Sequence, residues 1–84
     1  MTTLLYARWA LRRGDGNLVT PEILIDPLTE GTSTSKQKAE HCLLDAKMIA
    51  HLLPRVDPGA KVLWAEWGIQ FPDGGRIPVE SWTS

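Results

Sequence analysis

The chain has 84 residues, of which 43% are hydrophobic and 23% charged, and its formal net charge at pH 7 is −1. This composition is typical of one small globular domain and argues against disorder, but the core is thin, so self-association is one expected source of added stability. The near-neutral charge disfavours a dedicated DNA-binding protein, because such proteins usually carry a basic excess that neutralises phosphates.

The cellular compartment of the protein is indicated by features that the sequence lacks. The single cysteine, Cys42, excludes an intramolecular disulfide and suits a reducing environment. No basic segment leads into an apolar stretch at the N-terminus, so no signal peptide is expected. No apolar run approaches the roughly 18 residues of a membrane span. The sequence therefore predicts a cytoplasmic protein that has no membrane partner.

Residues 3–25 are predicted to form a β-hairpin. Residues 3–13 alternate between two faces, which is the pattern of a strand. The next four residues read Gly-Asp-Gly-Asn and tolerate the positive φ angles of a tight turn. Residues 18–25 return as a second strand, and Pro21, which lacks an N–H, places that strand at an edge or a bulge.

A polar loop is predicted over residues 26–34 and a helix over residues 35–53. Thr34, with a glutamine three residues on, fits a capping box, and either neighbouring serine is an alternative cap. Pro54 prevents the helix from continuing far.

The predicted helix carries two apolar stripes. A broad arc is expected to cover the sheet, while Leu44, Met48 and Leu52 recur every fourth residue on nearly the opposite side. The second stripe is covered by the 26–34 loop or a chain terminus, or it is a surface for a partner or a second copy, or it consists of scattered exposed residues.

A second hairpin is predicted over residues 61–82, and it repeats the first. Residues 64–80 align with residues 6–22 without a gap, including the tryptophan of each long strand (Trp9 and Trp67) and the Asp-Gly of each turn. The order ββαββ predicts an α+β fold, in which a four-stranded antiparallel sheet carries one helix on one face of a single domain. Strand order, and pairing within or between chains, stay open.

The two long strands are expected to place matched residues on matched faces. The helix side is predicted to carry Ala7, Trp9, Leu11, Leu63, Ala65, Trp67 and Ile69. The uncovered far side is predicted to carry Tyr6, Arg8, Val62, Trp64 and Glu66, with Trp82 as a candidate further member. If the long strands pair centrally, Arg8 and Glu66 can face each other. Aromatic residues on an uncovered face are candidates for a contact surface.

Catalytic chemistry finds little support. His41 and Asp45 share a helix face, as two metal ligands can, but no second pair of ligands has metal-like spacing, so a solvated pair is favoured. Cys42 is expected to point into the core. No convergent set of titratable groups can be assembled, so the sequence predicts a non-enzymatic protein without a metal or another cofactor.

The sequence of residues 66–69 (Glu-Trp-Gly-Ile), followed by residues 72–74 (Pro-Asp-Gly), resembles small proteins of actinobacterial phages and prophages. In those proteins a Glu-Trp-Gly-Val/Ile strand leads into an Asp-Gly hairpin. The first hairpin departs from that pattern and reads Arg-Trp-Ala at residues 8–10. The resemblance supplies no catalytic residues. It implies a phage origin and an accessory role, such as binding a host factor.

The leading interpretation is a small protein-binding accessory protein whose partners are a second copy and an unidentified host protein. The expected interaction surfaces are the helix stripe Leu44, Met48 and Leu52 and the far-face residues Tyr6, Trp64 and Arg8. The alternative is a nucleic-acid-binding module that uses Arg8, Arg12 and Arg13, because basic sheets with aromatic residues bind single strands. Glu66 on the same face weakens that alternative.

Overall fold

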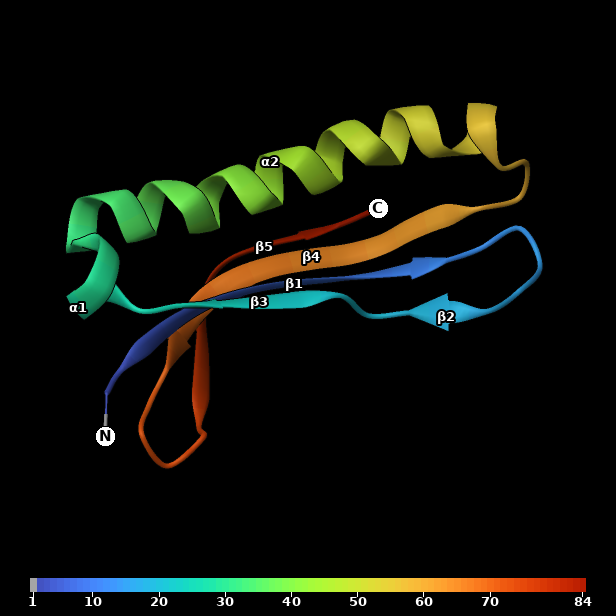
Figure 1. The fold of residues 1–84 in the computed structure, drawn as a ribbon. Coiled ribbons are helices and arrows are strands. Elements are labelled where there is room, and N and C mark those ends of the chain that lie inside the picture. Colours follow the sequence, from blue (N-terminus) through green and yellow to red (C-terminus); the bar gives the residue numbers. More distant parts are fainter. Residues whose placement is uncertain (1) are drawn as a thin grey trace.

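The computed structural model describes residues 2–84 and shows an α+β fold, in which a long helix packs over one face of an antiparallel sheet (Figure 1). The elements in chain order are β1 (Leu4–Arg12), β2 (Leu18–Val19), β3 (Glu22–Ile25), α1 (Pro27–Glu30), α2 (Thr32–Val56), β4 (Lys61–Gln70) and β5 (Arg76–Thr83). The predicted class is confirmed. The predicted strand 18–25 is divided, so the described residues form five strands rather than four.

The long strands β1 and β4 pair in the middle of the sheet. Next to them, β2 and β3 pair with the outer side of β1, and β5 pairs with β4. Both hairpins therefore pair within one chain. Arg8 lies opposite Glu66, and the repeat alignment matches the same two residues with each other. A pseudo-twofold axis consequently passes through this pair.

The two hairpin turns are built alike. Asp15 accepts the Asn17 backbone N–H at 2.9 Å in the first turn, and Asp73 accepts that of Gly75 at 2.8 Å in the second. The glycine after each aspartate has a φ angle of +92°, which side chains with a Cβ rarely adopt. The local hydrogen bonds thus confirm the hairpin repeat.

The returning strand of the first hairpin divides at Pro21. The Trp9 backbone N–H donates to the Pro21 carbonyl at 3.2 Å, but Pro21 has no N–H to return. The strand lies at the edge of the sheet, as the proline predicts.

An irregularity in β4 changes which residues face the helix. Ala10 pairs with Trp64, whereas Leu11 pairs with Val62, so Leu63 is an extra residue on β4. Such a bulge shifts the alternation by one residue. Val62 is therefore buried with 2% exposure, and its predicted place on the uncovered face is wrong.

A second irregularity lies between β4 and β5. Trp67 pairs with Glu80, but Gly68 pairs with Pro78, so Val79 is the extra residue. The backbones approach closely here: a Cβ on Gly68 would overlap the Ile77 carbonyl oxygen and lie 2.8 Å from the Pro78 Cα. The glycine is required by this close approach.

The helical segment is longer than the sequence indicates. Within the predicted loop 26–34, Asp26 caps α1 by accepting the Leu28 N–H at 2.9 Å. Helix α2 follows Gly31 and begins at Thr32, so Thr34 is an interior residue and not the cap. The helix passes Pro54, reaches Val56 and closes with the Asp57 N–H bonded to the Leu53 carbonyl at 2.8 Å.

The core lies between α2 and the central strands. Its buried residues are Ala7, Ile25, Ala39, Leu43, Ala46, Ala65 and Trp67, with Leu5, Trp9, Cys42 and Trp82 packed against them. Trp82 pairs with Ala65 and joins this core, so its placement as a candidate on the far face is wrong. Within residues 2–84, no helix has the length and apolar character needed to cross a membrane.

Candidate functional site

The second apolar stripe of α2 is exposed. Leu44, Met48 and Leu52 have exposed fractions of 52%, 61% and 53%, and Val56, one turn on, has 83%. These four residues, here called the α2 ridge, lie on one i+4 row of the helix. No segment of residues 2–84 covers them, which removes the alternative in which the 26–34 segment or a terminus does so.

Polar residues flank the α2 ridge. His41, Asp45, His51 and Arg55 are exposed on α2 beside it. An apolar centre with a polar rim is the usual arrangement of a protein-binding surface.

The far face of the sheet is organised around a buried tyrosine. Tyr6 has 0% exposure, and its hydroxyl donates to Glu66 Oε2 at 2.9 Å. Arg8 binds the other carboxylate oxygen through Nε and Nη2, each at 2.9 Å. Glu66 therefore binds both the Tyr6 hydroxyl and the Arg8 guanidinium. Because Tyr6 is fully buried, the expectation that it forms part of a contact surface is wrong.

Two guanidinium groups cover the aromatic rings of this face. The Arg76 Cζ lies 4.5 Å from the Tyr6 ring centre, and the Arg8 Cζ lies 5.7 Å from it and 5.3 Å from the Trp64 ring. Arg76 also donates from Nη1 to Glu22 at 3.0 Å. The charges are therefore balanced, two basic against two acidic, and the face is a satisfied structural network.

This network changes the titration of its members. Burial, followed by the hydrogen bond to Glu66, raises the pKa of Tyr6 to about 12. The hydrogen bond from Arg76 lowers the pKa of Glu22 and, from the other side, raises the pKa of Arg76.

The three arginines of the nucleic-acid alternative do not form one cluster. Arg8 is committed to Glu66 on the far face. Arg12 and Arg13 are exposed at the end of β1, where Arg13 Nε lies 3.9 Å from Asp15 Oδ2. Arg12 pairs with Lys61 across the strands, so some uncompensated positive charge remains there.

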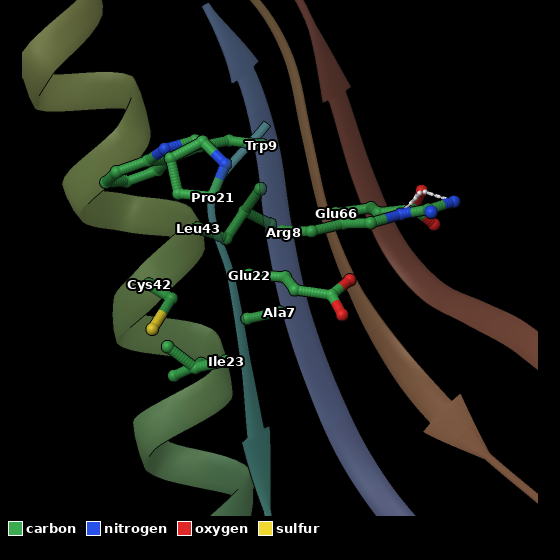
Figure 2. A pocket seen from close by; sticks show the side chains of 9 residues that line it. All are labelled: Ala7, Arg8, Trp9, Pro21, Glu22, Ile23, Cys42, Leu43 and Glu66. Atoms are coloured by element: carbon green, nitrogen blue, oxygen red, sulfur yellow. Dashed lines mark hydrogen bonds and ion pairs between the residues drawn. The ribbon is translucent and has the colours of Figure 1, made fainter. Parts of the chain in front are cut away.

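A cavity that sequence reasoning missed lies between β3 and α2. It has a volume of about 70 Å³ and an apolar lining that includes Trp9, Pro21, Ile23, Cys42 and Leu43. Ile23 and Trp9 point toward α2, whereas the side chains of Arg8, Glu22 and Glu66 point away (Figure 2). Burial, followed by the charge of Asp45, raises the pKa of Cys42. The only signal in the sequence is Pro21, which interrupts the strand above the cavity.

The two repeated tryptophans differ in their hydrogen bonds. Trp67 Nε1 donates to Glu80 Oε2 at 3.1 Å. Trp9 Nε1 is buried and has no partner within residues 2–84. The reason is register: Glu22, the counterpart of Glu80, pairs with Arg8 and lies on the opposite face of the sheet.

Metal-ligating residues do not converge. Within the described chain no three His, Cys, Asp or Glu side chains form a group that could hold a metal ion. His41 and Asp45 are both exposed on α2.

Comparison with known proteins identifies no relative. No family model matches this chain, and no curated protein or solved structure matches it either.

Proposed function

We propose that this chain is a small non-enzymatic protein-binding protein that docks a partner protein on the α2 ridge. The observation that carries the proposal is the exposure of Leu44, Met48 and Leu52, each above half, on a helix whose opposite side is buried in the core. A helix that only covered a sheet would gain nothing from a second apolar stripe.

The ridge has a geometry that suits a helical or grooved partner. Side chains on an i+4 row form a continuous ridge that fits the groove of another helix. Burying a whole side chain of this size contributes about 1.5–3 kcal/mol, so the half that remains exposed on each contributes on the order of 1 kcal/mol. Met48 is at the centre of the ridge, and its flexible thioether adapts to different partner surfaces.

The resemblance of residues 66–74 to small actinobacteriophage proteins supplies the setting of the proposal. The partner is then a host protein in the cytoplasm, and this chain acts as an accessory protein that modulates it.

The test is a pull-down with the tagged full chain from an actinobacterial lysate, with and without nuclease. The wild-type protein is compared with Met48→Asp and with Ile77→Asp, a matched control because Ile77 is a similarly exposed apolar residue (53%) on β5. A host protein retained by the wild type and Ile77→Asp but lost from Met48→Asp is the expected result. Equal retention by all three contradicts the proposal. Sedimentation of the purified protein shows whether the partner is a second copy.

A weaker candidate is nucleic-acid binding at the end of β1. The observation that favours it is Arg12, which faces Lys61 across the strands next to Arg13. If this function is correct, the affinity of the protein for single-stranded nucleic acid falls steeply as salt is added. The affinity is also lower in Arg12→Gln than in the wild type. Binding that is absent, or unaffected by salt, removes it.

A further inference from the structure

Strand β3 is an edge strand that α2 leaves partly uncovered. β3 pairs with β1 on one side and has no strand on its other side within residues 2–84. Helix α2 packs mainly over β4 and β1. Ile23 consequently remains 44% exposed, although it points toward the helix (Figure 2).

The free edge of β3 presents backbone hydrogen-bonding groups in a defined order. The Trp9 N–H donates to the Pro21 carbonyl, so Trp9 and Pro21 are a hydrogen-bonded pair of the antiparallel ladder between β1 and the returning strand. Bonded and non-bonded pairs alternate along an antiparallel ladder. Ile23 therefore bonds to β1, whereas Glu22 and Leu24 direct their backbone N–H and C=O groups away from the sheet. Such a row is a template for one further strand.

The apolar cavity lies directly beside this edge. Here called the β3–α2 groove, it is bounded by Pro21 and Ile23 on the strand side and by Cys42 and Leu43 on the helix side. In a strand added to β3, the residue opposite Ile23 would point to the helix side, because side chains opposite each other share a face. The volume of about 70 Å³ leaves space for one small side chain.

The lining further defines the occupant. Trp9 lines the cavity, but its indole N–H is buried away from the cavity surface and has no acceptor within residues 2–84. The cavity therefore suits an apolar side chain.

We infer that the β3–α2 groove binds an extended peptide segment of a partner protein. The segment adds to β3 as a further antiparallel strand and bonds to the backbone of Glu22 and Leu24. Its residue opposite Ile23 fills the cavity with a small apolar side chain, such as that of valine. This surface is separate from the α2 ridge.

The test uses random peptides displayed on phage and selected on the full chain. Selected sequences are expected to share a small apolar residue such as valine at one position, and a synthetic peptide of that sequence serves as the probe. N-methylation of that residue should leave affinity unchanged, whereas N-methylation of either flanking residue should weaken binding by about tenfold or more, because only the flanking N–H groups face β3.

Variants of the protein locate the site. Ile23→Lys is expected to abolish binding of the probe, whereas Ile77→Lys on the opposite edge strand should retain it. Circular dichroism checks that each variant is folded.

Three results would overturn the inference. The first is a selection that enriches no sequence. The second is N-methylation whose effect does not alternate along the probe. The third is binding of the probe that is lost in Met48→Asp but retained in Ile23→Lys. That result would place the binding site of the probe on the α2 ridge and leave the proposed function intact. Conversely, a pull-down that fails to depend on Met48 leaves binding at β3 unaffected.

Discussion

Arg8 and Glu66 face each other across the two central strands with Nη2 and Oε1 2.9 Å apart, and they are also counterparts in the hairpin repeat. Two identical hairpins related by this axis would place two arginines or two glutamates opposite each other, and like charges there are destabilising. Joining two diverged hairpins in one chain allows opposite charges at the axis. The ion pair thus depends on the difference between the repeats.

Replacing the axial carboxylate should destabilise the fold. Glu66→Gln removes the charge that Tyr6 and Arg8 both bind, and we expect a loss of about 1.5–3 kcal/mol in the free energy of unfolding, as for hydrogen bonds to charged groups. Urea titration measures it. In a double-mutant cycle with Arg8→Met, a coupling near zero would contradict the pairing.

Stability should fall in alkaline solution because of Tyr6. Its pKa is raised from 10.0 to about 12 in the folded protein, so the unfolded chain loses the phenol proton at lower pH than the folded protein does. The stabilisation is therefore complete below about pH 10 and is lost as pH rises toward about 12. Unfolding measured across this range should show a smaller decline in Tyr6→Phe, and the phenolate absorbance should appear late in the wild type. A normal phenol titration would refute the burial.

The two repeated glutamates should differ in their effects. Glu80→Ala leaves Trp67 Nε1 without its acceptor, and we expect a loss of about 1–3 kcal/mol in the free energy of unfolding. Glu22→Ala breaks only an exposed pair with Arg76, so its effect should be smaller. Thermal or urea unfolding of both variants provides the comparison, and equal losses would count against the indole hydrogen bond.

Gly68 should not tolerate a side chain. Gly68→Ala introduces a Cβ into the Ile77 carbonyl oxygen, and forcing the strands apart should cost about 1–3 kcal/mol. Gly75→Ala is the control, because its nearest neighbour is the movable Asp73 carboxylate at 3.1 Å. Unfolding midpoints in urea should separate the two variants, with Gly68→Ala the less stable, and similar midpoints would argue against the close approach.

Local sequence signals predicted those parts of the fold that depend on neighbouring residues. The Asp-Gly pairs after Gly14 and Pro72 define the turns because their hydrogen bonds and φ angles are local. Alternation placed Trp9 and Trp67 on the helix side, and the period of four residues identified Leu44, Met48 and Leu52 of the α2 ridge, to which the structure adds Val56.

The strand faces were predicted only up to the first irregularity. The bulge at Leu63 turns Val62 into the core, and no single residue there announces it, because a bulge is decided by how two distant strands fit together. The same limit explains Tyr6, whose burial depends on Arg8 and on Arg76 from a different strand.

The sequence by itself determined the class of fold, the two hairpins, their repeat and the apolar row on the helix, because each follows from residue types at short spacing. Only the tertiary structure decided that the repeats meet at Arg8 and Glu66, that Tyr6 is covered, and that an apolar cavity lies beside β3. Those features arise from the register between strands far apart in the chain. A one-residue difference in register carried Glu22 to the face opposite Trp9, whereas its counterpart Glu80 reaches Trp67.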